Sequence, residues 1–226
     1  MTNQDKYHFV LRKFHSLIGL LVVGIFLFFH GMINSTISNG FGAEVFNKIA
    51  ISLQYVPYII MVELALGFFI LFHAIYGLVI IYKAHNNPIQ YGFWRNLRFL
   101  FQRYSGLVIL GFILFHVITM KYGVYAHDVE PGENGMFSII APWLSSWYGI
   151  VIYSLGIIAA TFHLANGIWG FLITWGITTG KKAQKISAWA CGFIFIAITS
   201  VFIAVMLVMY IKAQDPGNLA LPSPLL

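Results

Sequence analysis

The sequence contains little charge and almost no cysteine. Charged residues make up only 9% of its 226 residues, whereas 59% are hydrophobic. A soluble globular domain averages about 25% charged residues, so this composition predicts an integral membrane protein. The single cysteine, Cys191, excludes a disulfide framework, a cysteine-ligated iron–sulfur cluster and a covalent CxxCH haem site within the chain.

Acidic residues are also few, and the chain is therefore basic. The chain has 7 Asp and Glu residues against 13 Lys and Arg residues, which gives a net charge of +6. A basic balance can indicate nucleic-acid binding, but the placement of these cations fits membrane topology better, so we expect no nucleic-acid partner. The N-terminal segment lacks a small-residue cleavage site after the first apolar run, so we expect no cleaved signal peptide.

Five apolar runs are each long enough to form a membrane-spanning helix. A hydrocarbon core about 30 Å thick needs about 20 such residues, and the runs cover residues 14–38, 57–82, 104–123, 146–175 and 187–211. We therefore expect an all-α membrane protein in which five transmembrane helices form a single membrane domain over residues 1–226. The segment 121–145 contains several proline and glycine residues, and we expect a long loop there.

The segment between the second and third runs is polar and aromatic. Pro88 ends the preceding helix, and beyond it aromatic residues mix with Arg95, Arg98 and Arg103. This mixture is typical of a helix that lies on a membrane surface, so we predict an interfacial helix at about residues 89–102.

The basic residues are distributed unevenly between the two sides of the predicted bundle. Cytoplasmic segments of membrane proteins are enriched in Lys and Arg, and with the N-terminus inside, ten such residues fall on the inner side and three on the outer side. We therefore expect the N-terminus inside and the C-terminus outside. The inner set is Lys6, Arg12, Lys13, Lys83, Arg95, Arg98, Arg103, Lys181, Lys182 and Lys185, and the outer set is Lys48, Lys121 and Lys212.

Each of the first four apolar runs contains one interior histidine. These residues are His30, His73, His116 and His163. Ionisable groups inside a membrane are costly and are usually functional. One neutral histidine bonded to a backbone carbonyl would be an ordinary structural feature, but one histidine in each of four helices favours a shared role.

Position along the helices sorts the four histidines into two layers. His30 lies nine residues before Asn39 and His116 lies five residues before Lys121, at the outer side, or roughly 7–14 Å at 1.5 Å per residue. His73 lies sixteen residues after Pro57 and His163 sixteen residues after Trp147 at the outer side, or roughly 24 Å. Two imidazoles from facing helices suit the axial ligation of one haem iron. We predict two stacked, non-covalent b haems, an outer one on His30 and His116 and an inner one on His73 and His163.

Other residues near these histidines are candidates for contacts with the cofactor. Small residues next to a ligand would make room for a porphyrin, although close helix packing is the alternative explanation; they are Gly77, Gly167 and Gly170. Polar and basic residues at the inner level would pair with haem propionates, although the arginines could serve topology alone; they are Arg12, His15, Ser16, Arg95 and Arg103.

Two carboxylates lie on the outer side of the predicted bundle. Glu44 falls in the first outer loop, and Glu63 falls in the outer half of the second run, about ten residues before His73. Either could exchange protons with a quinone at the outer haem. The alternatives are a surface role for Glu44 and an interhelical hydrogen bond for Glu63.

Several segments, taken together and in order, resemble one known family. They are RKFHSLIG with VGIFLFFH, GAEVFN, FHAIYGLVI with KAHNN, YGFWRNLRFLFQRYSGLVIL with FH, and FHLANGIWGFLITWGIT, and they span about residues 7–190. The chain resembles the diheme cytochrome b membrane anchor of succinate dehydrogenases and fumarate reductases, the succinate:quinone oxidoreductases, and is most similar to the Bacillus type.

The resemblance implies a set of ligands and partners. The four axial histidines of the family fall on His30, His73, His116 and His163, with the first paired to the third and the second to the fourth. It further implies a flavoprotein with covalent FAD and an iron–sulfur protein as the partner subunits on the inner face. Menaquinone would be the substrate, and the location would be the inner (cytoplasmic) membrane of a bacterial cell as a multi-pass protein.

One departure from the family bears on the direction of the reaction. Fumarate reductases of the epsilonproteobacterial type carry a glutamate two residues before the fourth ligand, where this chain has Thr161. Because threonine cannot titrate, we favour succinate oxidation with menaquinone reduction. The alternatives are the anchor of a menaquinol:fumarate reductase, the cytochrome b subunit of another membrane dehydrogenase such as a formate dehydrogenase or hydrogenase, and a transporter that uses its histidines as proton or metal sites.

Overall fold

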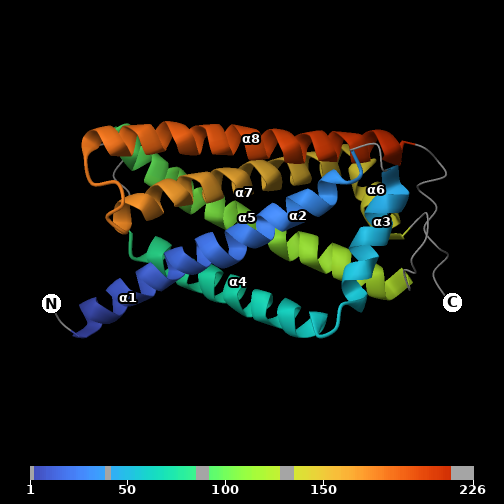
Figure 1. Cartoon of the computed structure of the whole chain (residues 1–226), viewed down its shortest axis with the longest axis horizontal. Helices are drawn as coiled ribbons and strands as arrows, with labels where there is room; N and C mark the ends of the chain where they lie inside the picture. The colour runs from blue at the N-terminus through green and yellow to red at the C-terminus, as the bar shows by residue number, and fades with distance from the viewer. Residues whose placement is uncertain (1–2, 39–41, 85–91, 128–134, 215–226) are drawn as a thin grey trace. The chain divides into compact units, whose positions relative to one another are not determined.

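The computed structural model describes residues 3–38, 42–84, 92–127 and 135–214, and all the regular structure in these ranges is helical (Figure 1). This confirms the all-α prediction. In chain order the elements are α1 (Asn3–Ile18), the π-helix η1 (Gly19–Gly24), α2 (Ile25–Ser35), α3 (Gly42–Ser52), the 3-10 turn η2 (Leu53–Tyr55), α4 (Ile59–Tyr82), α5 (Trp94–His127), α6 (Gly135–Leu144), α7 (Trp147–Thr174) and α8 (Lys181–Ala213).

Five helical stretches of the described chain are long and apolar enough to cross a membrane, as the sequence predicted. They are Asp5–Ser35, Ile59–Tyr82, Trp94–Lys121, Trp147–Thr174 and Lys181–Ala213. The first starts well before the predicted residue 14, because its polar N-terminal part contains no glycine or proline that would end the helix. The protein is therefore a multi-pass membrane protein.

Two local predictions differ from the structure. The interfacial helix predicted at 89–102 is not a separate element within the described residues, because α5 runs without a break from Trp94 to His127; Pro88 and residues 89–91 lie outside the described residues. No glycine or proline interrupts the chain between Trp94 and Ser105, so the surface-like segment simply continues into the span. The expected loop at 121–145 contains α6, whose side chains are mostly buried.

The chain divides into two compact units, and the single membrane domain that we expected stays a prediction. Unit 1 comprises Met1–Leu27, Val62–Val108 and Ala159–Ile198, and unit 2 comprises Phe28–Met61, Ile109–Ile158 and Thr199–Leu226. Each of the five spanning stretches contributes residues to both units. The histidine pairs therefore fall in different units, with His73 and His163 in unit 1 and His30 and His116 in unit 2.

Aromatic contacts hold the helices of unit 1 together. Phe14 of α1 packs edge-on against Phe72 of α4, with ring centres 5.2 Å apart. Phe162 of α7 packs in the same way against Phe195 of α8, at 5.8 Å. Edge-to-face pairs of this kind add about 0.5–1.5 kcal/mol beyond the burial of their area.

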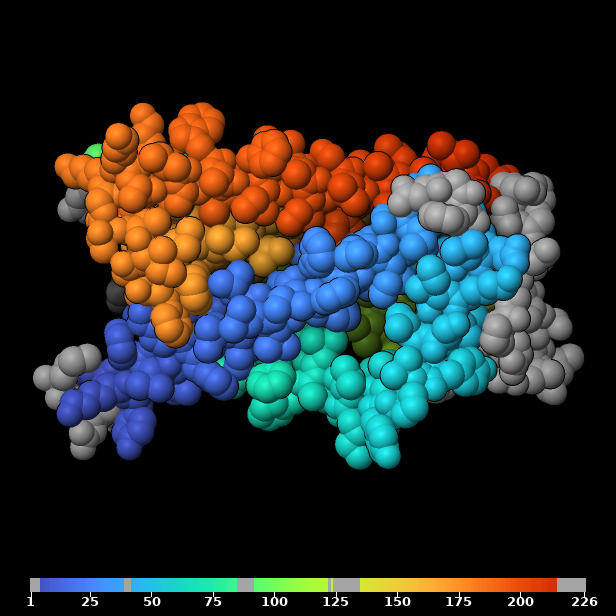
Figure 2. All heavy atoms as spheres, viewed as in Figure 1, coloured from blue at the N-terminus to red at the C-terminus, as the bar shows by residue number. Residues whose placement is uncertain are grey.

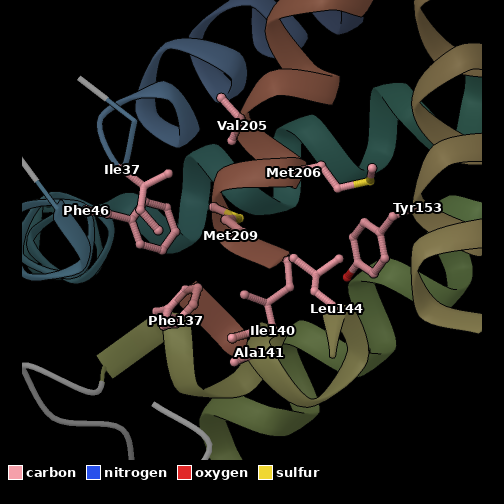
Figure 3. Packing of buried hydrophobic residues seen from close by; sticks show 11 residues of the cluster. Ile37, Phe46, Phe137, Ile140, Ala141, Leu144, Tyr153, Val205, Met206 and Met209 are labelled. Carbon is pink, nitrogen blue, oxygen red and sulfur yellow. The ribbon is translucent and has the colours of Figure 1, made fainter. Parts of the chain in front are cut away.

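Unit 2 has a continuous hydrophobic core, shown in Figure 3. Phe137, Ala141 and Leu144 of α6 pack there with residues of α8 and with Phe46 of α3. The core members are Ile37, Phe46, Phe137, Ile140, Ala141, Leu144, Tyr153, Val205, Met206, Met209 and Ala213. Burial in this core explains why the short helix α6 forms inside a segment that looks like a loop.

Large apolar side chains remain exposed on the spanning helices, as a bilayer requires. On α8, seen in orange to red in Figure 2, Ile186, Trp189, Phe193 and Ile196 are exposed at intervals of three and four residues. This spacing places them on one face of the helix, and such a stripe is suited to contact with lipid.

A buried amide links α3 to α6 and provides a test of this packing. Asn47 is 0% exposed, and its Oδ1 accepts a hydrogen bond from the backbone N–H of Phe137 at 2.9 Å. We predict that Asn47→Ala lowers the stability of the chain by about 1–3 kcal/mol, because the N–H of Phe137 is left buried without that acceptor. Unfolding in detergent measures the change. Lys48→Ala, on the exposed side of α3, is the control and should have no measurable effect, and equal stability of both variants would contradict the prediction.

Candidate functional site

Unit 1 brings together the two histidines that were predicted to form the inner pair. The rings of His73 on α4 and His163 on α7 have centres 6.2 Å apart and planes at 83°. His73 Nδ1 donates to the backbone oxygen of His15 at 3.1 Å, and His163 Nδ1 donates to that of Gln102 at 3.0 Å. Because a carbonyl oxygen can only accept, each ring carries its proton on Nδ1. Each Nε2 lone pair is then available to a metal.

Two glycines let these rings approach the neighbouring helices. A side chain at Gly19, the first residue of η1, would overlap the His73 ring. A Cβ at Gly106 of α5 would lie 3.2 Å from Cε1 of His163. The imidazoles therefore pack directly on backbone. The π-helical turn that begins at Gly19 is of a kind often found at functional sites.

His15 forms the third ring of this cluster. It stacks in parallel on His73, with ring centres 4.0 Å apart and planes at 5°. Its Nδ1 is buried and has no hydrogen-bond partner among the described residues. Gly77 lies against it, since a Cβ there would be 3.3 Å from Cε1 of His15. Gly77 thus makes room for His15.

Unit 2 brings together the predicted outer pair. The rings of His30 on α2 and His116 on α5 have centres 5.9 Å apart and planes at 80°. His116 Nδ1 lies 3.3 Å from the hydroxyl of Tyr153, a side chain that is 5% exposed. The neighbouring Gly31 is needed for packing, because a Cβ there would lie 2.9 Å from the ring of Phe202.

Both pairs have a spacing that is compatible with a shared metal. An imidazole nitrogen binds a transition metal at about 2 Å, so two rings on opposite sides of one ion have centres roughly 6 Å apart. Among the described residues, no group of three or more His, Cys, Asp or Glu side chains is arranged around a possible metal position. Each pair offers two ligands, which suits a metal that already carries other ligands of its own.

The predicted propionate residues have varied surroundings. Ser16 donates to the backbone oxygen of Lys13 at 2.9 Å and accepts from Nε1 of Trp175 at 3.1 Å. Arg95 is exposed and hydrogen-bonds Oε1 of Gln184. Arg12 is exposed and Arg103 is half-buried. All four residues belong to unit 1, together with His15.

The two other predicted glycines differ from each other. A Cβ at Gly167 would touch Nε2 of Gln102 at 3.4 Å, which is an ordinary van der Waals contact. A Cβ at Gly170 would meet no described atom within 4 Å. Of the predicted small residues, Gly170 therefore leaves the most space beside α7.

The two candidate carboxylates belong to different units. Glu63 is half-buried in unit 1, and Glu44 is exposed in unit 2. Glu44 forms an ion pair with Lys48 at 2.6 Å. The hydrogen bond and charge of Lys48 lower the pKa of Glu44 below its ordinary value of 4.5. Glu44 is therefore ionised at neutral pH, which makes it a weak base for a quinone oxygen.

Sequence reasoning missed the polar residues that hold the histidines. Gln102 and Ser105 hydrogen-bond His163, Asn166 hydrogen-bonds Gln102, and Tyr153 contacts His116. Asn166 is 4% exposed and Ser105 is 9% exposed. A carboxamide three residues after a predicted ligand, inside an apolar run, was the available signal, because buried amides need partners.

The comparison with curated proteins fits this arrangement. The succinate dehydrogenase cytochrome b558 subunit of Bacillus subtilis (strain 168) is 35% identical over 194 residues, which cover 85% of this chain and 93% of that protein. The chain belongs to the family of succinate dehydrogenase cytochrome b subunits. The family resemblance found in the sequence is thus confirmed. No protein-family model and no solved structure matches the chain.

The state of Glu44 in this cytochrome b subunit can be tested by removing its partner. We predict that Lys48→Met raises the pKa of Glu44 toward 4.5, because the hydrogen bond and the positive charge that favour the carboxylate are lost. In the unaltered chain the Glu44–Lys48 pair contributes its full stabilisation of the fold above the ordinary pKa of glutamate. This stabilisation is lost as the pH falls through the lowered pKa of Glu44. A pH titration of the labelled glutamate carboxyl groups by NMR measures the shift. Lys121→Met is the control, and an unchanged Glu44 pKa in Lys48→Met would contradict the assignment.

Proposed function

We propose that this chain is the membrane anchor and electron-transfer subunit of a succinate:menaquinone oxidoreductase. Electrons would pass from an iron–sulfur partner protein, docked on the inner face, to menaquinone. A flavoprotein with FAD would complete the complex at the cytoplasmic membrane of a bacterial cell. The observation that carries the proposal is the presence of one matched histidine pair in each unit of a chain from this family.

The donor set of each pair fits a haem b. A porphyrin supplies four nitrogens to its iron, so two axial imidazoles complete the coordination. We assign His73 and His163 to an inner haem and His30 and His116 to an outer haem. When bound, each haem would accept and release one electron at its iron.

The surroundings of the inner pair favour stable ligation. His73 and His163 donate their Nδ1 protons to backbone carbonyls, which raises the basicity of Nε2 and fixes the direction of each ring. In unit 1 we assign the propionates to Arg12, His15, Ser16, Arg95 and Arg103. The buried and unpartnered Nδ1 of His15 supports this assignment, because an anionic oxygen would satisfy it. Gly170 would face the porphyrin.

The charge of the two units supports an orientation with the N-terminus inside. Unit 1 contains ten of the 13 Lys and Arg residues and two of the seven Asp and Glu residues. Unit 2 contains the other three basic residues and the other five acidic residues. Cytoplasmic segments are enriched in Lys and Arg, so unit 1 would contain the ends of the spans on the cytoplasmic side. This agrees with the assignment of His73 and His163 to the inner haem.

The absence of a carboxylate from α7, the helix that carries His163, supports the direction of succinate oxidation. Thr161 on α7 is 1% exposed and has no titratable proton. α7 contains no carboxylate at all, so this helix offers no acidic residue to carry a proton alongside an electron. Quinone reduction would then take its protons from the outer side, near Glu44 of unit 2 or near Glu63, which is only two residues past the end of the unit 2 segment at Met61.

The inner ligands can be tested by counting haem. We predict that His163→Ala or His73→Ala reduces the haem content from two to one per chain, because one axial ligand is removed from the inner site only. Electron flow from succinate to quinone should stop. The pyridine haemochrome assay on purified complex gives the count.

The matched variant for this test is His116→Ala, which should also leave one haem per chain but a different one. The optical spectrum distinguishes which haem each variant retains. A wild-type chain with one haem or none would contradict the two-haem assignment, and so would a His163→Ala variant that keeps both.

The quinone role of Glu44 has its own test. We predict that Glu44→Gln slows menaquinone turnover about tenfold or more and leaves reduction of a soluble dye by succinate intact. A positioned acid–base group typically contributes about 10²–10⁴-fold, and a weak base such as Glu44 should contribute less. Lys48→Met, which keeps the carboxylate, is the control. Equal loss of both activities in Glu44→Gln would refute the role, because it would indicate a damaged complex.

A further inference from the structure

A buried polar network joins α5 to α7 in unit 1 and ends at His163. Its members are Arg98 and Gln102 of α5 and Asn166 of α7. Arg98 is 8% exposed and Asn166 is 4% exposed. Burying an amide without hydrogen-bond partners costs about 1–3 kcal/mol in protein mutational data. The buried position of Asn166 therefore depends on its partners Arg98 and Gln102.

Asn166 uses every hydrogen-bonding atom of its side chain. Its Nδ2 donates to Oε1 of Gln102 at 2.7 Å and to the backbone oxygen of Arg98 at 3.1 Å. Its Oδ1 accepts from Nε of Arg98 at 2.7 Å. An arginine Nε can only donate, so the orientation of the Asn166 amide is unambiguous. The face of Trp169 covers the Arg98 guanidinium at 4.1 Å.

Gln102 contacts His163 in both directions. Its backbone oxygen accepts from His163 Nδ1 at 3.0 Å, and its side-chain Nε2 donates to the backbone oxygen of His163 at 3.0 Å. The side-chain amide can donate to His163 only while its Oε1 points to a different partner. That partner is Asn166, so Asn166 selects the orientation of the Gln102 amide.

We propose that Asn166 is a positioning residue for the inner haem ligand, acting through Gln102. Asn166 holds the Gln102 side chain, and this keeps α5 in one rotation about its own axis relative to α7. The rotation in turn fixes the direction in which Nε2 of His163 points. The proposal rests on the proposed function, because it requires His163 to be an axial ligand. It adds a residue outside the ligand set, since the hydrogen bonds of the Asn166 side chain go to Arg98 and Gln102.

Two variants of Asn166 separate positioning from simple packing. Asn166→Ala removes all three hydrogen bonds. Asn166→Asp keeps the volume and the acceptor for Arg98 but cannot donate to Oε1 of Gln102. We expect both variants to retain the inner haem in a distorted site, to shift its low-spin EPR signal, and to leave the signal of the outer haem unchanged.

The strength of haem binding provides a second measurement. Loss of a residue that orients a metal ligand typically weakens metal binding about 10–100-fold. We expect the transfer of the inner haem from membranes containing the full chain to apomyoglobin to accelerate by that factor in both variants. The double variant Asn166→Ala with Gln102→Ala should be no worse than Gln102→Ala alone, because residues that act in series are not additive.

Ser187→Ala is the matched control. Ser187 is a buried polar residue of unit 1, 8% exposed, whose hydroxyl donates to the backbone oxygen of Gln184 at 3.1 Å. It should change neither haem signal. An inner EPR signal and a transfer rate in Asn166→Asp equal to those of the wild type would overturn the inference, and so would equal effects on both haems. A wild-type chain that gives one haem signal or none would instead contradict the proposed function.

Discussion

The histidine pair of unit 1 depends on one kind of hydrogen bond, an imidazole Nδ1–H donated to a main-chain carbonyl of another helix. His73 of α4 donates to His15 of α1, and His163 of α7 donates to Gln102 of α5. A main-chain carbonyl neither titrates nor rotates independently of its helix. The tautomer and direction of each imidazole are therefore set by helix packing, and any change in that packing is transmitted to Nε2.

The two units achieve this control by different means. In unit 1, Gly19 and Gly106 leave space for the imidazole rings of the histidine pair. Backbone carbonyls accept hydrogen bonds from these rings, and a buried amide network lies beside them. Unit 2 has a continuous apolar core that includes Tyr153, and the phenol of this residue contacts His116. In a bilayer the surrounding lipid is as apolar as the helix surfaces, so close packing and interhelical hydrogen bonds must hold the helices together. Both devices follow from that constraint.

The sequence predicted the features that depend on composition and on distance along a helix. Five apolar runs became five spans, and depth alone paired His73 with His163 and His30 with His116, the pairs whose rings lie together in the structure. The ligand role of these pairs stays a prediction. The course of α5 was not predicted, because aromatic and basic residues are compatible both with a surface helix and with the first turns of a span.

The residues that orient the histidines could not be predicted either. Whether Gln102 faces His163 depends on the rotation of α5 about its own axis, which a hydrophobic pattern does not specify where polar and apolar residues are mixed, as they are around Gln102. The same limit applies to Gly77, whose contact with His15 was not predicted; its expected contact with a porphyrin stays a prediction. α6 was missed because its burial depends on partners in α3 and α8 that are distant in sequence.

The most direct test is the EPR spectrum of the oxidised wild-type chain in its membrane complex. Two imidazole pairs in separate units should give two distinct low-spin ferric haem signals, and both should respond when succinate and then fumarate are added. A single low-spin signal, or a preparation with no haem signal, would contradict the assignment of one haem to each histidine pair.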